Sequence, residues 1–309
     1  MGNTIIQYLG SVSGNKTYIK RDDLIPLSFG GNKARKAFNF FREIDAGNYD
    51  CVVTYGSSSS NHCRIISNMA IMRGMECFII SPQESSAPTF NSRMMRVFGA
   101  KITIVPVGEV HDTIENKLRE LKESGRNPYF IAGGGHGNLG TQAYVDCYKE
   151  IREYEAEQKM HFDYVFFATG TGTTQAGLVC GQLIYKDPRK IVGISIARAN
   201  PGGRQVVLDS IQEYLAEKKI VISNECMEAS VMVDDSYIGP GYGQGNEEIR
   251  QTIREMLIHN GIPMDATYTG KAYAGMKKYI KEHGIYNANI LFIHTGGVPL
   301  FFDELRFLK

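Results

Sequence analysis

Short runs of β-branched and aromatic residues recur along this chain of 309 residues, with helix-like patterns between them. The clearest runs cover residues 51–55, 77–80, 101–105, 164–168, 191–196 and 290–294. Strands that are apolar along their whole length are buried on both faces, which is typical of parallel sheets covered by helices. The sequence therefore predicts the α/β class, with open, twisted, mostly parallel sheets and helices on both faces.

The composition is that of an ordinary globular enzyme and excludes several other classes. Apolar residues make up 43% of the chain, charged residues 22%, and the formal net charge is +1. Because the net charge is so close to zero, electrostatics gives no reason to expect binding to nucleic acid or to an anionic membrane. No apolar stretch approaches membrane-spanning length, and the first residues lack a signal-peptide pattern, so we expect a cytoplasmic protein.

The six cysteines are scattered at positions 51, 63, 77, 147, 180 and 226. None forms a Cys-x-x-Cys pair, so the sequence indicates neither a zinc site nor a disulfide framework. Several lie inside apolar runs, where buried free thiols in a reducing compartment are the usual outcome. We expect no bound metal.

A glycine- and threonine-rich turn follows the apolar run that ends at Ala168. Its residues are Gly170, Thr171, Gly172, Thr173 and Thr174. Converging backbone N–H groups, a helix N-terminus and hydroxyls form an anion site suited to phosphate. The turn is not a dinucleotide fingerprint, because Gln175 occupies the position of the third glycine, and no Gly-Lys-Ser/Thr follows for a nucleotide loop. A merely tight turn remains the alternative.

A second polar turn, residues 57–62, follows the run at 51–55 and opens a helix. A flexible loop is the usual meaning of four serines. Here the serine hydroxyls and helix N–H groups would meet at the carboxyl edge of a sheet, where open α/β sheets bind ligands. A carboxylate-binding role fits this turn. His62 and Cys63 form no direct nucleophilic pair, since adjacent helical residues point about 100° apart.

Lys33 lies in the run Gly30-Gly31-Asn32-Lys33, where two glycines permit a tight turn before a helix. A lysine at such a junction can be partly desolvated, which lowers its pKa and makes it a nucleophilic amine. An exposed lysine on a first helical turn is the alternative. Three further turns place hydroxyls beside glycines, at residues 239–243, 265–271 and 294–299.

A single amine, a phosphate site and several hydroxyl-bearing turns suit pyridoxal 5′-phosphate, whose aldehyde requires an amine and whose phosphate requires an anion site. Taken together, these ordered motifs resemble the 1-aminocyclopropane-1-carboxylate deaminase/D-cysteine desulfhydrase family of fold type II pyridoxal phosphate enzymes, which are similar to the tryptophan synthase β chain. The resemblance covers nearly the whole chain. It implies an active site between a larger and a smaller domain, a small amino acid as substrate, and a homodimer.

The resemblance also implies roles for the matching residues. Lys33 would hold the cofactor covalently and act as the base at Cα. Gly170 to Thr174 would hold the phosphate, and Thr269 or Thr295 would approach the pyridine nitrogen. The substrate carboxylate would meet the turn at residues 59–62, and two tyrosines would flank the substrate. The individual residues are Ser59, Ser60, Asn61 and His62 for the carboxylate, Asn61 also for the cofactor ring, and Tyr242 and Tyr268 for the substrate.

Three positions depart from the family pattern. Ser59 stands where glutamine is usual, Thr173 where glycine is usual, and Thr269 where the ring-opening deaminases have glutamate. A neutral hydroxyl would not keep the pyridine ring protonated, so Thr269 favours β-elimination of the D-cysteine desulfhydrase type. The alternatives are deamination of aminocyclopropane carboxylate, β-elimination or replacement on another substituted amino acid, cofactor binding without turnover, and a phosphate-ester enzyme without pyridoxal.

A charged helix at residues 150–159 separates two parts of the chain. We take it as a hinge, and expect a smaller α/β domain at 45–155. A larger cofactor-binding domain would then be formed by 1–44 together with 156–309.

Overall fold

The computed structural model describes residues 2–239, 241 and 243–308, which group into two compact units. The smaller unit holds residues 26–28 and 33–140, and the larger unit holds the remaining segments up to 25, 29–32 and from 141 onward. These boundaries differ from the expected ones at two helices. α1 (Asn32–Ala46) groups with the smaller unit from its second residue, and α5 (Asn138–Gln158) with the larger unit from Thr141.

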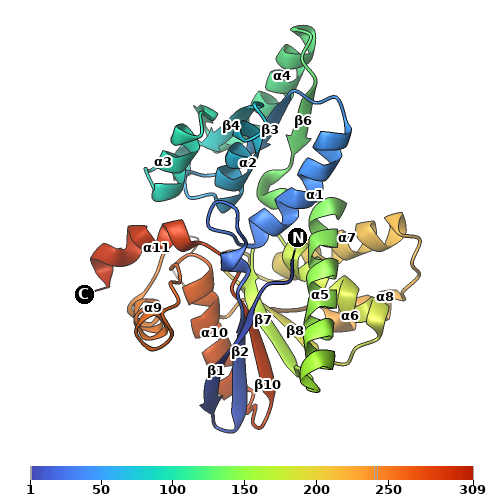
Figure 1. Ribbon diagram of the computed structural model, residues 1–309, viewed down its shortest axis with the longest axis vertical. Helices are drawn as coiled ribbons and strands as arrows, with labels where there is room; N and C mark the ends of the chain where they lie inside the picture. Colours follow the sequence, from blue (N-terminus) through green and yellow to red (C-terminus); the bar gives the residue numbers. More distant parts are fainter. Residues whose placement is uncertain (1, 240, 242, 309) are drawn as a thin grey trace. The chain divides into compact units, whose positions relative to one another are not determined.

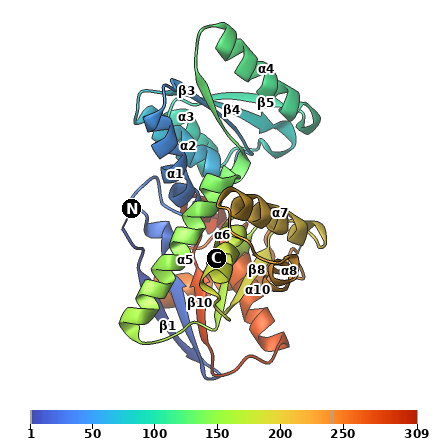
Figure 2. The same ribbon diagram turned by 90° about the vertical axis from the view of Figure 1, so that its right-hand side faces the viewer.

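The smaller unit contains a four-stranded parallel sheet in the order β5-β4-β3-β6 (Figures 1 and 2). Its strands are β3 (Cys51–Tyr55), β4 (Glu76–Pro82), β5 (Lys101–Val105) and β6 (Pro128–Ile131). Its helices besides α1 are α2 (Asn61–Ile71), α3 (Phe90–Val97) and α4 (Val110–Glu123). On one face of the sheet, Cys51 and Val53 pack with Ile114 and Leu121 of α4. Alternate residues such as Val52, which is fully buried, therefore point to the opposite face.

The larger unit contains a six-stranded sheet in the order β1-β2-β10-β7-β8-β9 (Figures 1 and 2). All neighbouring strands are parallel except the β1–β2 hairpin. The strands are β1 (Ile6–Val12), β2 (Asn15–Lys20), β7 (Tyr164–Thr169), β8 (Lys190–Ser195), β9 (Met232–Asp234) and β10 (Asn289–Ile293). The helices besides α5 are α6 (Thr173–Tyr185), α7 (Gly202–Glu217), α8 (Asn224–Ser230), α9 (Glu247–Asn260), α10 (Thr269–Glu282) and α11 (Val298–Glu304).

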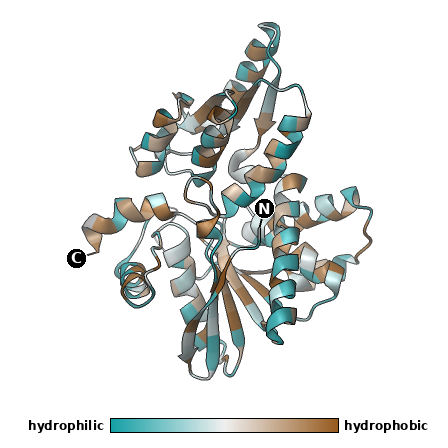
Figure 3. Ribbon diagram, viewed as in Figure 1, coloured by the Kyte–Doolittle hydropathy of each residue, from teal (hydrophilic) through white to brown (hydrophobic). Residues whose placement is uncertain are grey.

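The central strands of this sheet are buried on both faces, as their apolar sequences predict. Phe166 of β7 joins a core formed with α9, α10 and α11, whereas Val165 and Phe167 join a second core formed with α5, α6, α7 and α8. Figure 3 shows hydrophobic residues along these strands and mainly hydrophilic residues on α5. The predicted α/β class with two largely parallel sheets is confirmed, and all six predicted strands form.

The sequence reasoning missed four strands. β1 and β2 form an edge hairpin whose side chains are partly exposed, and β6 and β9 are only four and three residues long. Short or half-exposed strands lack the continuous apolar pattern that marks a buried one. Residues 150–158 of the charged segment form the end of α5 without a break, and Ile151 among them is fully buried. In the described part of the chain, no helix is long and apolar enough to cross a membrane.

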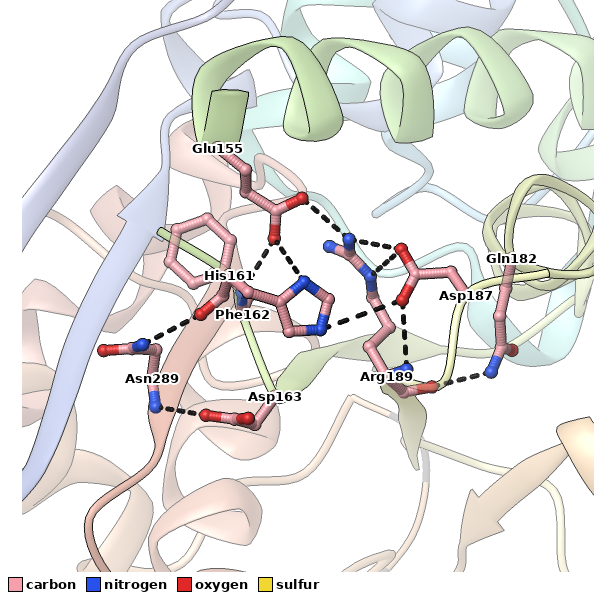
Figure 4. Close-up of polar contacts among 8 residues, drawn as sticks. All are labelled: Glu155, His161, Phe162, Asp163, Gln182, Asp187, Arg189 and Asn289. Atoms are coloured by element: carbon pink, nitrogen blue, oxygen red, sulfur yellow. Dashed lines mark hydrogen bonds and ion pairs between the residues drawn. The ribbon is translucent and has the colours of Figure 1, made fainter. Parts of the chain in front are cut away.

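A buried arginine links the end of α5 to the start of β8 in the larger unit (Figure 4). The guanidinium of Arg189 donates to Asp187 through Nε and Nη2, at 3.0 and 2.6 Å, and to Glu155 at 2.7 Å. His161 lies between the same two carboxylates, 3.6 Å from Glu155 Oε1 and 3.8 Å from Asp187 Oδ1. Burial opposes ionisation of Asp187, but the hydrogen bonds and the charge of Arg189, together with the Tyr148 hydroxyl, outweigh it and lower the pKa of this carboxyl.

We predict that Asp187→Asn destabilises the larger unit by about 3–5 kcal/mol, because it leaves part of the Arg189 charge buried without its partner. Glu282→Gln on α10 is the matched control, since its pair with Lys278 is exposed and contributes about 0–1 kcal/mol. Urea unfolding measures both. The native pKa of Asp187 is lowered, so its contribution is present above the unfolded pKa and lost as the pH falls through the native one. Equal unfolding midpoints for the two variants at pH 7 would contradict the prediction.

Candidate active site

Three of the turns singled out in the sequence directly follow parallel strands, each at the carboxyl edge of its sheet. Residues 170–172 follow β7 and residues 294–297 follow β10, both in the larger unit. Residues 56–60 follow β3 in the smaller unit. The carboxyl edge is where backbone N–H groups of the next helix and turn side chains become available to a ligand.

Lys33 is the second residue of α1 and belongs to the smaller unit. Its Nζ donates to the carbonyl oxygen of Gly134 at 3.0 Å, in the turn after β6. Desolvation by the surrounding protein lowers the pKa of Lys33 to about 8. At neutral pH about a tenth of this amine is therefore unprotonated, compared with a negligible fraction for an exposed lysine.

Two further basic groups lie in the same region of the smaller unit. Lys36 is 1% exposed, and its Nζ has no hydrogen-bond partner among the described residues. Burial and the charge of Lys33 lower the pKa of Lys36 well below its usual range. Burial, together with the charges of Lys33 and Lys36, also lowers the pKa of His62, which is therefore neutral. An anion bound here would offset the cost of burying these cations.

His62 has a defined tautomer. Its Nε2 lies 2.8 Å from Thr54 Oγ1, and that hydroxyl donates its proton to the carbonyl oxygen of Ile131 at 2.7 Å. The Thr54 oxygen must therefore accept, so His62 carries its proton on Nε2. The ring is almost fully buried, so this contact ties α2 to the sheet.

The serine turn caps α2. Ser60 is its N-cap, and its Oγ accepts from Cys63 N at 3.1 Å, while Ser57 and Ser59 share a hydrogen bond of 3.1 Å between their hydroxyls. Cys63 is fully buried, and burial raises the pKa of its thiol to about 12. The thiol thus stays protonated at neutral pH, in keeping with the expectation that it forms no nucleophilic pair with His62.

The glycine- and threonine-rich turn leads into α6. Gly172 is the N-cap of α6, with φ of 87°, a conformation that side chains rarely adopt, and a Cβ there would lie 3.2 Å from Val206. Thr174 Oγ1 accepts from Asn32 Nδ2 at 3.1 Å, so the residue before Lys33 is bonded to this turn. The N-terminal amides of α6, the hydroxyls and the close backbone form an arrangement that fits a phosphate group.

Asp265 organises the third part of the site and was missed in the sequence. Its Oδ1 accepts from the amides of Thr267 and Tyr268 at 2.9 and 2.7 Å. Its Oδ2 accepts from the amide and hydroxyl of Thr269 at 3.2 and 3.0 Å. The Asp-x-x-x-Thr spacing before a helix is an Asx-type turn signal that could have identified it. Tyr268 is the N-cap of α10, and Thr269, its first residue, is fully buried.

The turn after β10 contacts both Asn32, which is bonded to the glycine- and threonine-rich turn, and Asp265. The carbonyl oxygen of Thr295 accepts from Asn32 N at 2.9 Å. Gly297 has φ of 94°, and a Cβ there would collide with the Asp265 carboxylate, so only glycine fits. The Thr295 hydroxyl makes no hydrogen bond with the described residues, whereas the Thr269 hydroxyl donates to Asp265.

Most of the predicted site residues therefore fall into two groups. In the larger unit, Asn32 connects the turn at 170–174 with Thr295, and Asp265 connects Thr269 with Gly297. In the smaller unit, Lys33 and Lys36 influence His62, which directly follows Asn61 in α2. Tyr242, predicted to flank the substrate, lies outside the described residues.

Known proteins resemble this chain over nearly its whole length. The family model described as pyridoxal-phosphate dependent enzyme matches residues 1–296. A D-cysteine desulfhydrase of Serratia proteamaculans is 30% identical over 95% of this chain and 90% of its own length. A Pyrococcus furiosus protein, provisionally named 1-aminocyclopropane-1-carboxylate deaminase, is 31% identical over 96% of this chain and 89% of its own length.

A solved structure agrees with these matches. The crystal structure of a homologue of 1-aminocyclopropane-1-carboxylate deaminase superposes with a TM-score of 0.88 at 30% identity, covering 100% of this chain and 94% of that one. The fold type II architecture inferred from the motifs and the pyridoxal 5′-phosphate cofactor are thus confirmed. The chain belongs to the pyridoxal-phosphate-dependent enzymes, in the group of the D-cysteine desulfhydrases and 1-aminocyclopropane-1-carboxylate deaminases.

Proposed function

We propose that this enzyme catalyses β-elimination on a small amino acid, with D-cysteine as substrate and sulfide, pyruvate and ammonia as products, as a D-cysteine desulfhydrase does. The observation that carries the proposal is the amine of Lys33, whose pKa is lowered to about 8 while its neighbour Lys36 is buried without an acidic partner. Such an amine can attack an aldehyde at neutral pH, and later accept a proton from carbon.

The residues present fit pyridoxal 5′-phosphate. The turn at 170–174 would hold the phosphate at the N-terminus of α6, and Lys33 would hold the aldehyde carbon. Thr295, whose hydroxyl has no partner among the described residues, would meet the pyridine nitrogen in preference to Thr269, which donates to Asp265. When bound, the cofactor withdraws electrons from the substrate's Cα and so makes its proton acidic.

Residues of the protein bind the substrate and carry out the proton transfer. Ser59, Ser60 and Asn61 bind and orient the substrate carboxylate, which places the Cα–H bond toward Lys33. Once the substrate amine has displaced Lys33 from the aldehyde carbon, the freed Lys33 amine would remove the Cα proton, and the thiolate would leave from Cβ. The aminoacrylate that forms hydrolyses to pyruvate and ammonia. Tyr268 and Tyr242 flank the substrate. We further propose that the enzyme works in the cytoplasm as a homodimer.

Thr269 favours elimination over ring opening. Its hydroxyl is hydrogen-bonded to the buried carboxylate of Asp265, and its own side chain carries no charge. Burial raises the pKa of Asp265, although hydrogen bonds from Tyr268 and Thr269 oppose this effect. A threonine hydroxyl near the ring nitrogen, from Thr295 or from Thr269, supplies no counter-charge to a protonated pyridine ring, which the ring-opening reaction would require.

The test is an amino-acid panel that follows oxo-acid formation and sulfide release. We expect pyruvate and sulfide from D-cysteine, and about a thousandfold loss of that activity in Lys33→Ala. Arg42→Ala, an exposed position on the same helix, is the control and should retain activity. Formation of 2-oxobutyrate from aminocyclopropane carboxylate, or no product from D-cysteine, D-serine, 3-chloro-D-alanine and L-cysteate, would overturn the proposal.

The pH dependence of cofactor capture provides a second prediction. Only the neutral amine attacks the aldehyde, so the rate at which the cofactor-free protein captures pyridoxal 5′-phosphate should rise with pH and level off above about 8, the pKa of Lys33. Stopped-flow absorbance between pH 6 and 10 measures it. A midpoint near the usual lysine value of 10.5 would show that Lys33 is not desolvated.

The two threonines should behave differently. Thr269→Val removes a donor to the buried Asp265 carboxylate and should lower the unfolding free energy by about 1–3 kcal/mol. Thr295→Val should leave the unfolding free energy within about 0.5 kcal/mol and lower kcat about tenfold. Urea unfolding and steady-state kinetics on both variants test this assignment. The reverse pattern would place Thr269, not Thr295, at the ring nitrogen.

A further inference from the structure

The side chain of Asn61, at the start of α2, is held by two donors in the smaller unit. Asn91 Nδ2 donates to Asn61 Oδ1 at 2.9 Å, and Arg64 Nη2 lies 3.4 Å from the same oxygen. Both donors are fully buried, and Asn61 itself is 9% exposed. The Asn61 Nδ2 group has no acceptor among the described residues.

The chemistry of Arg64 decides which way the Asn61 amide points. The oxygen and nitrogen of an asparagine amide are nearly interchangeable in shape, so the hydrogen-bonding partners must distinguish them. A guanidinium group only donates, and the atom that faces Arg64 must therefore be the oxygen. Turning the amide over would place N–H groups against Arg64 and Asn91. Asn61 thus presents its nitrogen, with its N–H donors, away from these two residues.

Asn91 also fixes the backbone that carries Asn61. The same Nδ2 group donates to the carbonyl oxygen of Ser59 at 2.8 Å. One residue before α3, Thr89 donates from its hydroxyl to the carbonyl oxygen of Ser58 at 2.7 Å. The start of α3 therefore holds both the serine turn and the Asn61 side chain. Asn91 Oδ1 is buried without a partner, so this geometry is retained although it leaves an acceptor unsatisfied.

Arg64 adds charge behind the Asn61 amide. Its Nη1 donates to Ser28 Oγ at 3.0 Å, and its Nε is buried without a partner. No carboxylate pairs with it in the described part of the chain. Burial lowers the pKa of Arg64 to about 9, so the guanidinium remains largely charged at pH 7. A positive charge on the oxygen side of an amide polarises it and strengthens the N–H groups as donors to an anion.

We propose that Asn91 and Arg64 are positioning residues that hold Asn61 as a hydrogen-bond donor to an anionic oxygen of the bound ligand. This inference rests on the proposed function. The anionic oxygen belongs either to the phenolate of the cofactor or to the carboxylate of the substrate. Neither Asn91 nor Arg64 touches the ligand, because both act through the Asn61 amide.

Two substitutions at position 91 separate positioning from simple structural support. Asn91→Ala removes both hydrogen bonds but leaves Arg64 to orient Asn61. Asn91→Asp has nearly the same shape, but a carboxylate only accepts hydrogen bonds. It would either accept from the Asn61 N–H groups, which turns that amide over, or pair with Arg64. Either change weakens the binding of an anionic ligand. We expect Asn91→Asp to bind anionic probes at least about tenfold more weakly than the parent, and Asn91→Ala only about threefold more weakly, because Arg64 still orients Asn61. Asn116→Asp, exposed on α4, is the charge control.

The probes separate the two sources of the anion. Pyridoxal 5′-phosphate is titrated into the cofactor-free protein, and D-alanine and D-alaninamide are titrated into the holoenzyme while the cofactor absorbance is followed. Weaker cofactor binding in Asn91→Asp assigns the phenolate, and weaker D-alanine binding with unchanged D-alaninamide binding assigns the carboxylate. Either result supports the proposal. Unchanged binding of both, or a loss in Asn91→Ala as large as in Asn91→Asp, overturns it.

Substitutions of Arg64 test the proposal independently if Asn91→Asp does not fold. Arg64→Lys keeps a charged group that only donates, and should bind the same probes within about threefold of the parent. Arg64→Gln can present either an oxygen or a nitrogen to Asn61, so the amide is free to turn and affinity should fall about tenfold. Unfolding midpoints are measured for both. Equal probe affinities for the two variants would overturn the proposal, whatever their stabilities.

Discussion

The chemistry that we propose for this enzyme depends on the desolvation of one lysine. An amine that is fully hydrated is protonated at neutral pH, and only burial or nearby positive charge removes that proton. The structure supplies burial at Lys33, whose pKa falls to about 8, and places buried Lys36 one helical turn further along α1. The neighbouring ring of His62 is kept neutral by the same burial and the same charges.

Buried cations without acidic partners destabilise a folded protein unless an anion compensates them. Arg64 and Lys36 both contain buried nitrogens with no hydrogen-bond partner, and neither has a carboxylate partner in the described part of the chain. Elsewhere the protein neutralises such groups in the usual way, as Asp187 and Glu155 do for Arg189. The contrast supports the proposal that the positive charge near Lys33 serves the binding of anionic ligands rather than the stability of the fold.

Much of the architecture could be predicted because parallel strands require continuous apolar sequence. β7 and β8 are buried on both faces, and their residues show it without reference to any other part of the chain. β1 and β9 carry no such pattern, since edge and short strands need not be apolar on both sides. The turn at 170–174 and the serine turn were likewise recognisable, because glycines and hydroxyls directly after such strands are rarely placed there for packing alone.

The sequence by itself determined the strand pattern, the candidate lysine and the turns that could hold phosphate and carboxylate, because each depends on residues adjacent in the chain. Only the tertiary structure decided how those groups are oriented. Asp265 engages the Thr269 hydroxyl, and Asn91, 30 residues away, fixes the amide of Asn61. Hydrogen-bond direction and desolvation arise from what folding brings close in space, and neither can be obtained from local spacing alone.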